Sequence, residues 1–228
     1  MQSVTDAGAW VVCGWWSSGP SRRQERPGLG VLPVPRLEGD DQQVQPVIIE
    51  TGQLVLRPFT RDDVDWVHEV SLDPDVQNFV NLPWPYEREN AEAFVESLAI
   101  GGWASGQRYE FVVVDAATTA RVARVGLGIQ ADGAAEIGYW VHPAARGRGV
   151  ATAAVDAVCR WAFGSLGLQL IEWRAEVGNV ASRRVAEKAG FTIEATLRKR
   201  LVHRGLRVDA WVGSRTADST SAGLESPR

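Results

Sequence analysis

The feature that most constrains this chain runs from Glu136 to Thr152 and reads EIGYWVHPAARGRGVAT. The apolar residues up to Val141 suit a buried strand, and Pro143 ends that strand because proline has no N–H for the sheet ladder. Beyond the glycines, apolar side chains recur with a helical period, at Val155, Val158, Cys159, Ala162, Phe163 and Leu166. The stretch therefore predicts a strand, a glycine turn and a long amphipathic helix.

The glycine turn is typical of an anion-binding loop. The first N–H groups of the following helix lack intrahelical partners and lie at the positive end of the helix dipole. Gly147 and Gly149 have no Cβ atoms that would keep a ligand from the backbone. An ordinary basic helix N-terminus is the structural alternative. A damaged dinucleotide fingerprint with Glu172 as the ribose acid fails, because Thr152 replaces the third glycine and antiparallel strand patterns precede the loop.

Four ordered motifs carry a resemblance to a known family. The loop fits Arg/Gln-x-x-Gly-x-Gly/Ala at Arg146, Gly149 and Ala151. EIGYWV precedes the loop, Asn179-x-x-Ser182 follows the next strand pattern, and EKAGF closes the helix after it. From about residue 47 to 214 the chain resembles the GCN5-related N-acetyltransferase (GNAT) superfamily, and within it the branch of the ribosomal-protein acetyltransferases RimJ and RimL.

The resemblance and the periodicities together predict an α+β fold in α/β/α layers. The GNAT fold implies a mixed, mostly antiparallel twisted sheet of about seven strands flanked by about four helices. The patterns place strands at 53–58, 109–115, 120–130, up to 141, 170–176, 191–200 and 208–214, and helices at 61–71, 88–100, 150–166 and 180–189.

Three segments are expected along the chain. Residues 1–46 show no sustained period and are rich in turn and charged residues, so we expect a disordered leader, either dispensable or translated from a misassigned start. Residues 47–214 form the predicted N-acetyltransferase domain, and 215–228 a flexible tail.

Composition limits the possible partners. The formal net charge of −4 and pI near 5.5 argue against a nucleic-acid binder, and no stretch reaches the roughly 20 apolar residues that span a membrane. With only Cys13 and Cys159, a disulfide framework is excluded and a reduced cytoplasmic location is predicted. We expect no metal site, and either a monomer or a homodimer.

The resemblance implies a set of residues that bind acetyl-CoA. The backbone of the loop would bind the pyrophosphate, and Val141 would pair with the pantetheine if its strand splays from 170–176. Asn179 is either a helix N-cap or a cofactor contact, and these roles are compatible. Ser182 matches the position where this branch places a hydroxyl near the CoA sulfur, and is otherwise a solvated helix serine. The loop residues concerned are Arg146, Gly147, Arg148, Gly149, Val150, Ala151 and Thr152.

The predicted reaction is direct transfer of acetyl to a primary amine, either a peptide N-terminus or a small molecule. Glu136 is the candidate base for the amine proton, and its structural alternative is an exposed strand-end carboxylate. Trp84, Tyr86 and Trp140 are the candidates for lining the acceptor mouth, which would be framed by residues 81–86, the predicted helix at 88–100 and a hairpin loop at 201–208. Their structural alternative is a place in the core. A different class of function, a non-catalytic acyl-CoA sensor, stays open.

Overall fold

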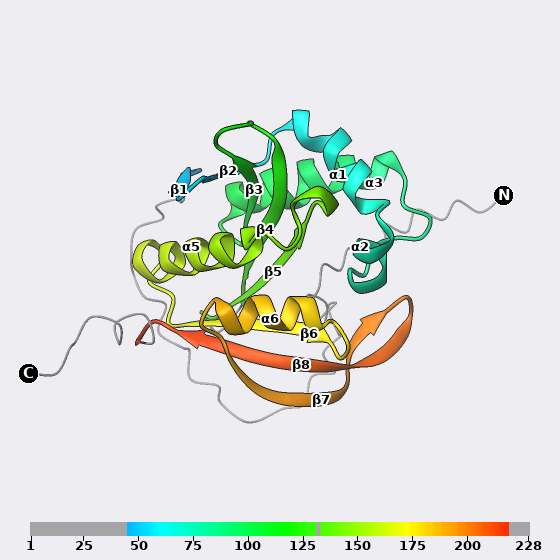
Figure 1. The fold of residues 1–228 in the computed structure, drawn as a ribbon, viewed down its shortest axis with the longest axis vertical. Coiled ribbons are helices and arrows are strands. Elements are labelled where there is room, and N and C mark those ends of the chain that lie inside the picture. Colours follow the sequence, from blue (N-terminus) through cyan, green and yellow to red (C-terminus); the bar gives the residue numbers. More distant parts are fainter. Residues whose placement is uncertain (1–44, 131–132, 219–228) are drawn as a thin grey trace, which may run out of the picture.

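In the part of the chain that the structure describes, one mixed sheet of eight strands organises the fold (Figure 1). The structure, a computed structural model, describes residues 45–130 and 133–218. The strand order is β1-β2-β3-β4-β5-β6-β8-β7, and among the described strands only β5 and β6 are parallel neighbours. The predicted α+β class is confirmed, with the three-residue β1 added to the seven expected strands. The strands are β1 Ile49–Thr51, β2 Leu54–Pro58, β3 Arg108–Asp115, β4 Arg121–Ile129, β5 Ala135–Val141, β6 Leu170–Glu176, β7 Thr192–His203 and β8 Leu206–Thr216.

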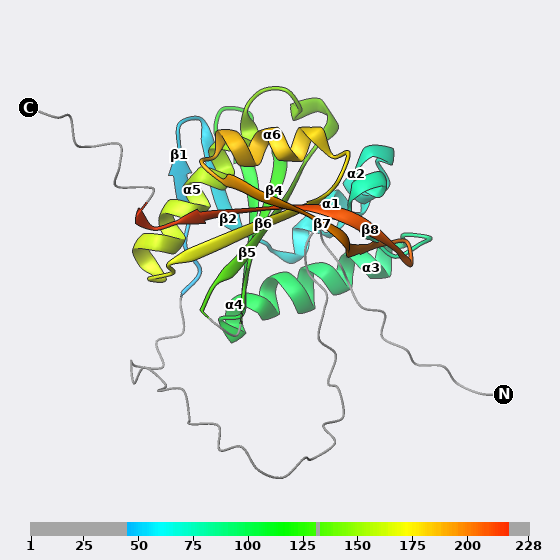
Figure 2. The same cartoon turned by 90° about the horizontal axis from the view of Figure 1, so that it is seen from below.

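Helices cover both faces of this sheet, and Figure 2 shows α6 on the side opposite α3 and α4. The face with α6 (Val180–Lys188) also carries α5 (Val150–Ser165). The other face carries α1 (Val64–Ser71) and one helical segment that runs through α3 (Arg88–Ala93), a π-helical turn and α4 (Gly101–Ser105). That segment is longer than the predicted helix at 88–100.

Two buried clusters hold these layers together. The larger lies between the sheet and α5, and it contains Val155, Val158, Cys159 and Ala162, as the helical period predicts. The second joins the sheet to α1 and α3 through residues such as Val70 and Val95. Along β5 the side chains alternate between the two clusters, because successive residues of a strand point to opposite faces. Tyr139 and Val141 pack against the first cluster and Trp140 against the second.

The short helix α2 (Pro74–Phe79) was missed by the sequence analysis, although its start signals are present. Asp73 is the N-cap, its carboxylate accepts a hydrogen bond from the N–H of Val76 at 3.0 Å, and Pro74 occupies the first helical turn. Both are ordinary N-terminal signals. Helix α2 matters because it forms one wall of the cavity described below.

The C-terminal hairpin differs from the prediction of a long loop at 201–208. Strands β7 and β8 continue through that range, and the turn consists of Arg204 and Gly205, with φ of 48° and 75°. Strand β8 also passes the expected domain end at 214, and Arg215 is buried against Asp156 and the carbonyl of Ala189. Alternation in the hairpin was harder to recognise because β7 is largely exposed.

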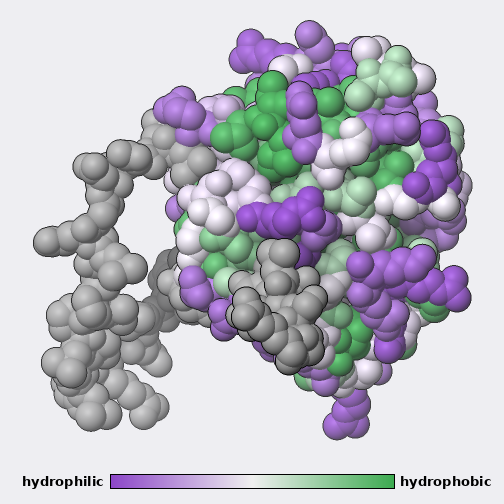
Figure 3. Space-filling view, turned by 60° about the vertical axis from the view of Figure 1, so that its left-hand side comes forward, coloured by the Kyte–Doolittle hydropathy of each residue, from purple (hydrophilic) through white to green (hydrophobic). Residues whose placement is uncertain are grey.

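The surface in Figure 3 mixes hydrophobic patches with hydrophilic side chains. Among the described residues, no helix has both the length and the apolar character needed to cross a membrane. The predicted leader, apart from residues 45 and 46, and the tail beyond 218 lie outside the described residues.

Candidate active site

The predicted anion-binding loop forms between β5 and α5. A 3-10 turn at Pro143–Ala145 follows β5, and Gly149 is the N-cap of α5. Gly147 and Gly149 have φ of 74° and 78°, a region that favours glycine, and no other group lies within 4 Å of where a Cβ would be. Both glycines are therefore required by the backbone, and they leave open space beside the helix N-terminus.

This N-terminus suits a phosphate group. Helix α5 is 16 residues long, and its N-cap has no side-chain hydrogen bond to the first turn. The N–H groups of Val150, Ala151 and Thr152 precede the first intrahelical bond, which runs from Ala153 to the carbonyl of Gly149 at 3.1 Å. Unpaired donors at the positive end of a helix dipole attract anions. The residues present thus fit the pyrophosphate of a CoA-type ligand.

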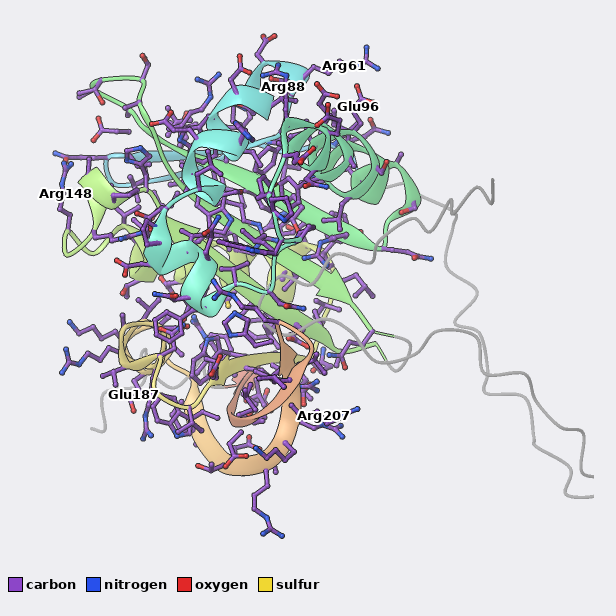
Figure 4. The ribbon with its side chains drawn as sticks, turned by 90° about the vertical axis from the view of Figure 1, so that its right-hand side faces the viewer. Arg61, Arg88, Glu96, Arg148, Glu187 and Arg207 are labelled. Carbon is purple, nitrogen blue, oxygen red and sulfur yellow. The ribbon has the colours of Figure 1, made fainter. Side chains whose placement is uncertain are left out.

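The side chains of the two arginines in the loop form ion pairs with aspartates of the protein. Arg146 donates to the carboxylates of Asp73 and Asp75 at 2.5 and 2.7 Å, so its side chain fixes α2 against the loop. Burial has the largest single effect and would raise the pKa of Asp73, but the hydrogen bond and charge of Arg146 and the hydrogen bonds from the backbone N–H groups of Val76 and Asp75 together lower that pKa. Arg148 projects outward (Figure 4), and its guanidinium lies 3.9 Å from Asp115.

The sheet opens directly beside this loop. Strands β5 and β6 are paired over three positions, the last being Ile137 with Trp173. Past that pair the two strands separate. This separation is the condition under which the family resemblance implies that Val141 pairs with the pantetheine. A cavity of about 560 Å³ occupies the opening, and it is lined by Tyr139, Trp140 and Val141 of β5, the loop, α2 and α6. This volume suits a cofactor or small-molecule site.

Helix α6 supplies the facing wall. Asn179 caps it, accepting from the N–H of Ser182 at 3.1 Å, and both residues line the cavity, so the capping prediction is confirmed. Arg184 and Lys188, which the sequence analysis did not single out, line the same wall. Their i, i+4 spacing on the helix was the available signal, because such residues share one face.

Ser182 is engaged by two aromatic side chains from neighbouring strands. The indole N–H of Trp173 donates to Ser182 Oγ at 3.1 Å, and Ser182 Oγ donates to the Tyr139 hydroxyl at 3.1 Å. The Tyr139 hydroxyl in turn donates to the Ser182 carbonyl at 2.8 Å. Ser182 is therefore not the freely solvated helix serine of the alternative interpretation.

Glu136 lies at the paired end of β5 and does not line the cavity. It is 3% exposed, which contradicts the alternative of an exposed strand-end carboxylate. Its Oε1 has no hydrogen-bond partner within the described part of the chain, and Arg174 is 3.6 Å from Oε2. Burial raises the pKa of Glu136 to about 8; the charge of Arg174 opposes this rise and that of Glu172 adds to it.

The three candidate substrate aromatics are not together. Trp140 lines the cavity and packs on Trp66, with ring centroids 4.9 Å apart. Trp84 is 70% exposed under the guanidinium of Arg204. Tyr86 is only 6% exposed within the second core cluster, so its placement favours the core interpretation over acceptor contact.

The β7–β8 hairpin lies beside the segment that follows α2. At the β7–β8 turn, Arg204 donates to Asn81 at 3.0 Å through its backbone N–H, which ties the hairpin to the segment after α2. His203 contacts Glu176 at 2.8 Å. Across residues 45–130 and 133–218, no group of three or more His, Cys, Asp or Glu side chains is placed to hold a metal ion.

Comparison with known proteins agrees with this geometry. A family model described as an acetyltransferase (GNAT) domain matches residues 53–192. The uncharacterized N-acetyltransferase p20 of Bacillus licheniformis is 26% identical over 168 residues, which cover 72% of this chain and 93% of that protein. The putative ribosomal N-acetyltransferase YdaF of Bacillus subtilis (strain 168) is 40% identical over 75 residues, which cover 33% of this chain and 41% of that protein.

The fold has solved counterparts. RimL, a ribosomal L7/L12 alpha-N-protein acetyltransferase solved in complex with coenzyme A, matches with a TM-score of 0.68 at 22% identity, covering 76% of this chain and 99% of that one. At that identity the likeness concerns the fold.

The loop, the split sheet and these matches define an acyltransferase that acts on nitrogen. Because the family model spans more than half of the 228 residues, the chain belongs to the GNAT acetyltransferase family.

Proposed function

We propose that this enzyme transfers the acetyl group of acetyl-CoA directly to a primary amine, either the α-amino group of a protein N-terminus or a small-molecule amine. The observation that carries the proposal is one continuous cavity, which joins the anion-binding loop to the Ser182 hydroxyl through the opening between β5 and β6. A cavity of this shape can accept a long ligand with an anionic end and a reactive end.

The residues of this chain divide the binding task. The N–H groups from Val150 to Thr152 would bind the pyrophosphate, with Arg184 and Lys188 adding positive charge at the cavity wall. Val141 would offer backbone groups to the pantetheine amides, as an added strand does. A thioester, when bound, supplies an already activated acyl group, so the protein must mainly orient the amine and move protons.

Glu136 is the proposed acceptor of the amine proton. A general base works best when its pKa lies near the working pH, and the pKa of Glu136 is raised to about 8, which is also near the value for an α-amino group. Glu136 lies about 10 Å along β5 from Tyr139, on the face that it shares with Trp140. Water would therefore have to connect Glu136 with an amine bound beside Trp140.

Two considerations favour a protein N-terminus as acceptor. An α-amino group loses its proton more easily than a lysine side chain, whose pKa is about 10.4. Two similar proteins also have names that refer to ribosomal proteins. RimL is described as a ribosomal L7/L12 alpha-N-protein acetyltransferase, and YdaF as a putative ribosomal N-acetyltransferase. The cytoplasmic location and the monomeric or homodimeric state stay predictions.

Gly149→Asp tests the cofactor site. The variant places a carboxylate and a Cβ in the space beside the α5 N-terminus, so we expect acetyl-CoA binding, measured by calorimetry, to be lost. Gly167→Asp is the matched control, because Gly167 also has a positive φ, of 66°, with nothing within 4 Å of its Cβ position. Equal affinity in Gly149→Asp and the wild type would contradict the assignment.

Turnover is measured separately, as thiol release from acetyl-CoA with a panel of N-terminal peptides and small amines. Release by the wild type supports the enzyme. Tight acetyl-CoA binding without release for any amine would support the acyl-CoA sensor instead.

A further inference from the structure

Three polar side chains from three elements meet where β5 and β6 separate. Trp173 comes from β6, Tyr139 from β5 and Ser182 from α6, and they are linked by the hydrogen bonds described above. Trp173 is 1% exposed, whereas Tyr139 and Ser182 line the cavity. The cluster thus lies at the inner end of the opening and presents hydroxyl groups to whatever occupies it.

The hydrogen-bonding capacity of a serine hydroxyl limits what this cluster can do. A hydroxyl has one proton to donate and two lone pairs that accept. As placed, Ser182 Oγ accepts from Trp173 and donates to Tyr139, while the Tyr139 proton points to the Ser182 carbonyl at 2.8 Å. A rotation of the phenol O–H toward Oγ, 3.1 Å away, would reverse the bond between the two hydroxyls.

After that reversal, both lone pairs of Ser182 Oγ are occupied, one by the Trp173 N–H and one by the Tyr139 O–H. The serine proton then has no place within the cluster and must point into the cavity. The indole cannot reverse its own bond, because a tryptophan nitrogen only donates. One rotation of a phenol proton therefore converts Ser182 from a donor within the cluster into a donor toward the ligand.

We propose that Tyr139, supported by Trp173, is a positioning residue that directs the Ser182 hydroxyl at the sulfur of the coenzyme. The inference rests on the proposed function and deepens it, since it names the residues that control the donor. The ligand it concerns is the thiolate form of CoA, which gains from a charge-assisted hydrogen bond that a neutral thioester does not need.

The proton transfers balance within this arrangement. As the C–S bond breaks, the sulfur takes the Ser182 proton and Ser182 Oγ takes the phenol proton of Tyr139. Glu136 has taken the ammonium proton before the attack and releases it to solvent, and the phenolate recovers through water the second proton, which the attacking nitrogen gives up when the amide forms. One proton moves from nitrogen to sulfur overall, and the protein returns to its starting state. A phenol suits this step better than a lone serine, because it is much the stronger acid.

Binding of CoA and of desulfo-CoA, which lacks the sulfur, tests the inference without turnover. Both ligands are titrated by calorimetry between pH 7 and 9. We expect the wild type to prefer CoA increasingly as the thiolate forms, and Tyr139→Phe to reduce that preference roughly tenfold, the size of a lost hydrogen bond to a charged group. Affinity for desulfo-CoA should stay unchanged, because the ring and its packing are kept.

Two further variants make the result specific. Tyr109→Phe is the matched control, because Tyr109 is buried against Trp103 and Trp161 and does not line the cavity. Loss of its hydroxyl should not change the preference for CoA over desulfo-CoA. Ser182→Ala should abolish the preference, and Tyr139→Phe added to it should have no further effect, because both act through one hydroxyl.

The possible outcomes separate cleanly. An unchanged preference in Tyr139→Phe overturns the inference, and so does an equal loss of affinity for CoA and desulfo-CoA, which would make Tyr139 merely structural. If the wild type binds neither CoA nor desulfo-CoA, the proposed function itself is wrong. That result differs from one in which the wild type binds both ligands and Tyr139→Phe changes nothing.

Discussion

Two buried glutamates on the same face of the sheet have pKa values shifted in opposite directions. Glu110 on β3 is 0% exposed and Glu136 on β5 is 3% exposed, so burial disfavours the charged form of both. Yet the pKa of Glu110 lies below its ordinary value, whereas that of Glu136 is raised to about 8. Burial is nearly equal, so the difference must come from their partners.

Glu110 is held on both oxygens. Arg124 donates to its Oε1 and Oε2 at 2.5 and 2.6 Å, and Arg108 adds a third bond at 2.5 Å. Burial alone would raise the pKa of Glu110, but these two charges outweigh it. Gly126 completes the arrangement, because a Cβ there would lie 2.3 Å from the Glu110 carboxylate and the Arg124 guanidinium.

The charged form of Glu136 is stabilised much less by neighbouring groups. Arg174 lies 3.6 Å away and is shared with Glu172, which it binds at 2.7 Å. The ion-paired Glu110 therefore stabilises the sheet, whereas Glu136 can exchange a proton near neutral pH. Carboxylates whose environments push their pKa values apart are a feature of acid–base sites.

The largest expected effect is on stability, from Glu110→Gln. The substitution leaves the buried charge of Arg124 without its counter-ion, so we expect the free energy of unfolding to fall by about 3–5 kcal/mol in urea denaturation. Glu92→Gln serves as control, since it breaks only an exposed helix pair with Arg88 and should change little. A loss below that of the control would show that the pair does not brace the sheet.

The next prediction concerns Glu136→Gln, which should lower kcat by roughly 10²–10⁴-fold if Glu136 is the base. The loss should shrink as pH approaches the pKa of the amine, because free amine then forms without help. Acetyl-CoA affinity should not change. A wild-type kcat from pH 6 to 9 would reassign deprotonation to water or another group.

The same variant should alter the pH dependence of stability. Because the folded pKa of Glu136 is raised from 4.5 to about 8, folded protein holds the proton more tightly than unfolded chain does. Its stabilising contribution is complete below pH 4.5 and is lost as pH rises through about 8. Glu136→Gln should therefore gain in Tm relative to the wild type as pH increases. A constant difference in Tm from pH 5 to 9 would contradict the raised pKa.

The smallest effect is expected from Glu172→Gln. It removes a like charge near Glu136 and frees Arg174 from competition, and both changes lower the pKa of Glu136. The acidic limb of the pH–kcat profile should move to lower pH by a fraction of a unit, with kcat at its maximum retained. Glu89→Gln, on the exposed side of α3, controls for net charge. A shift to higher pH would exclude Glu136 as the group being titrated.

Local sequence patterns were sufficient for the elements that form the binding loop. The strand up to Val141, the stop at Pro143, the positive-φ glycines and the buried stripe of α5 each depend on residues a few positions apart. Alternation and helical period report such neighbours directly, because they follow from backbone geometry. The capping role of Asn179 was predictable for the same reason. Helix α2 was missed although Asp73 and Pro74 marked its start.

The residues of the sequence therefore determined an acetyltransferase-type loop and the layers around it. Only the tertiary structure decided how distant side chains meet: Tyr139 and Trp173 at Ser182, Arg146 at Asp73, and the buried Glu136 beside Arg174. These contacts join positions that can be as much as 73 residues apart, and no local period encodes them. Burial and hydrogen-bond partners, which set pKa values and proton directions, exist only after the sheet has formed.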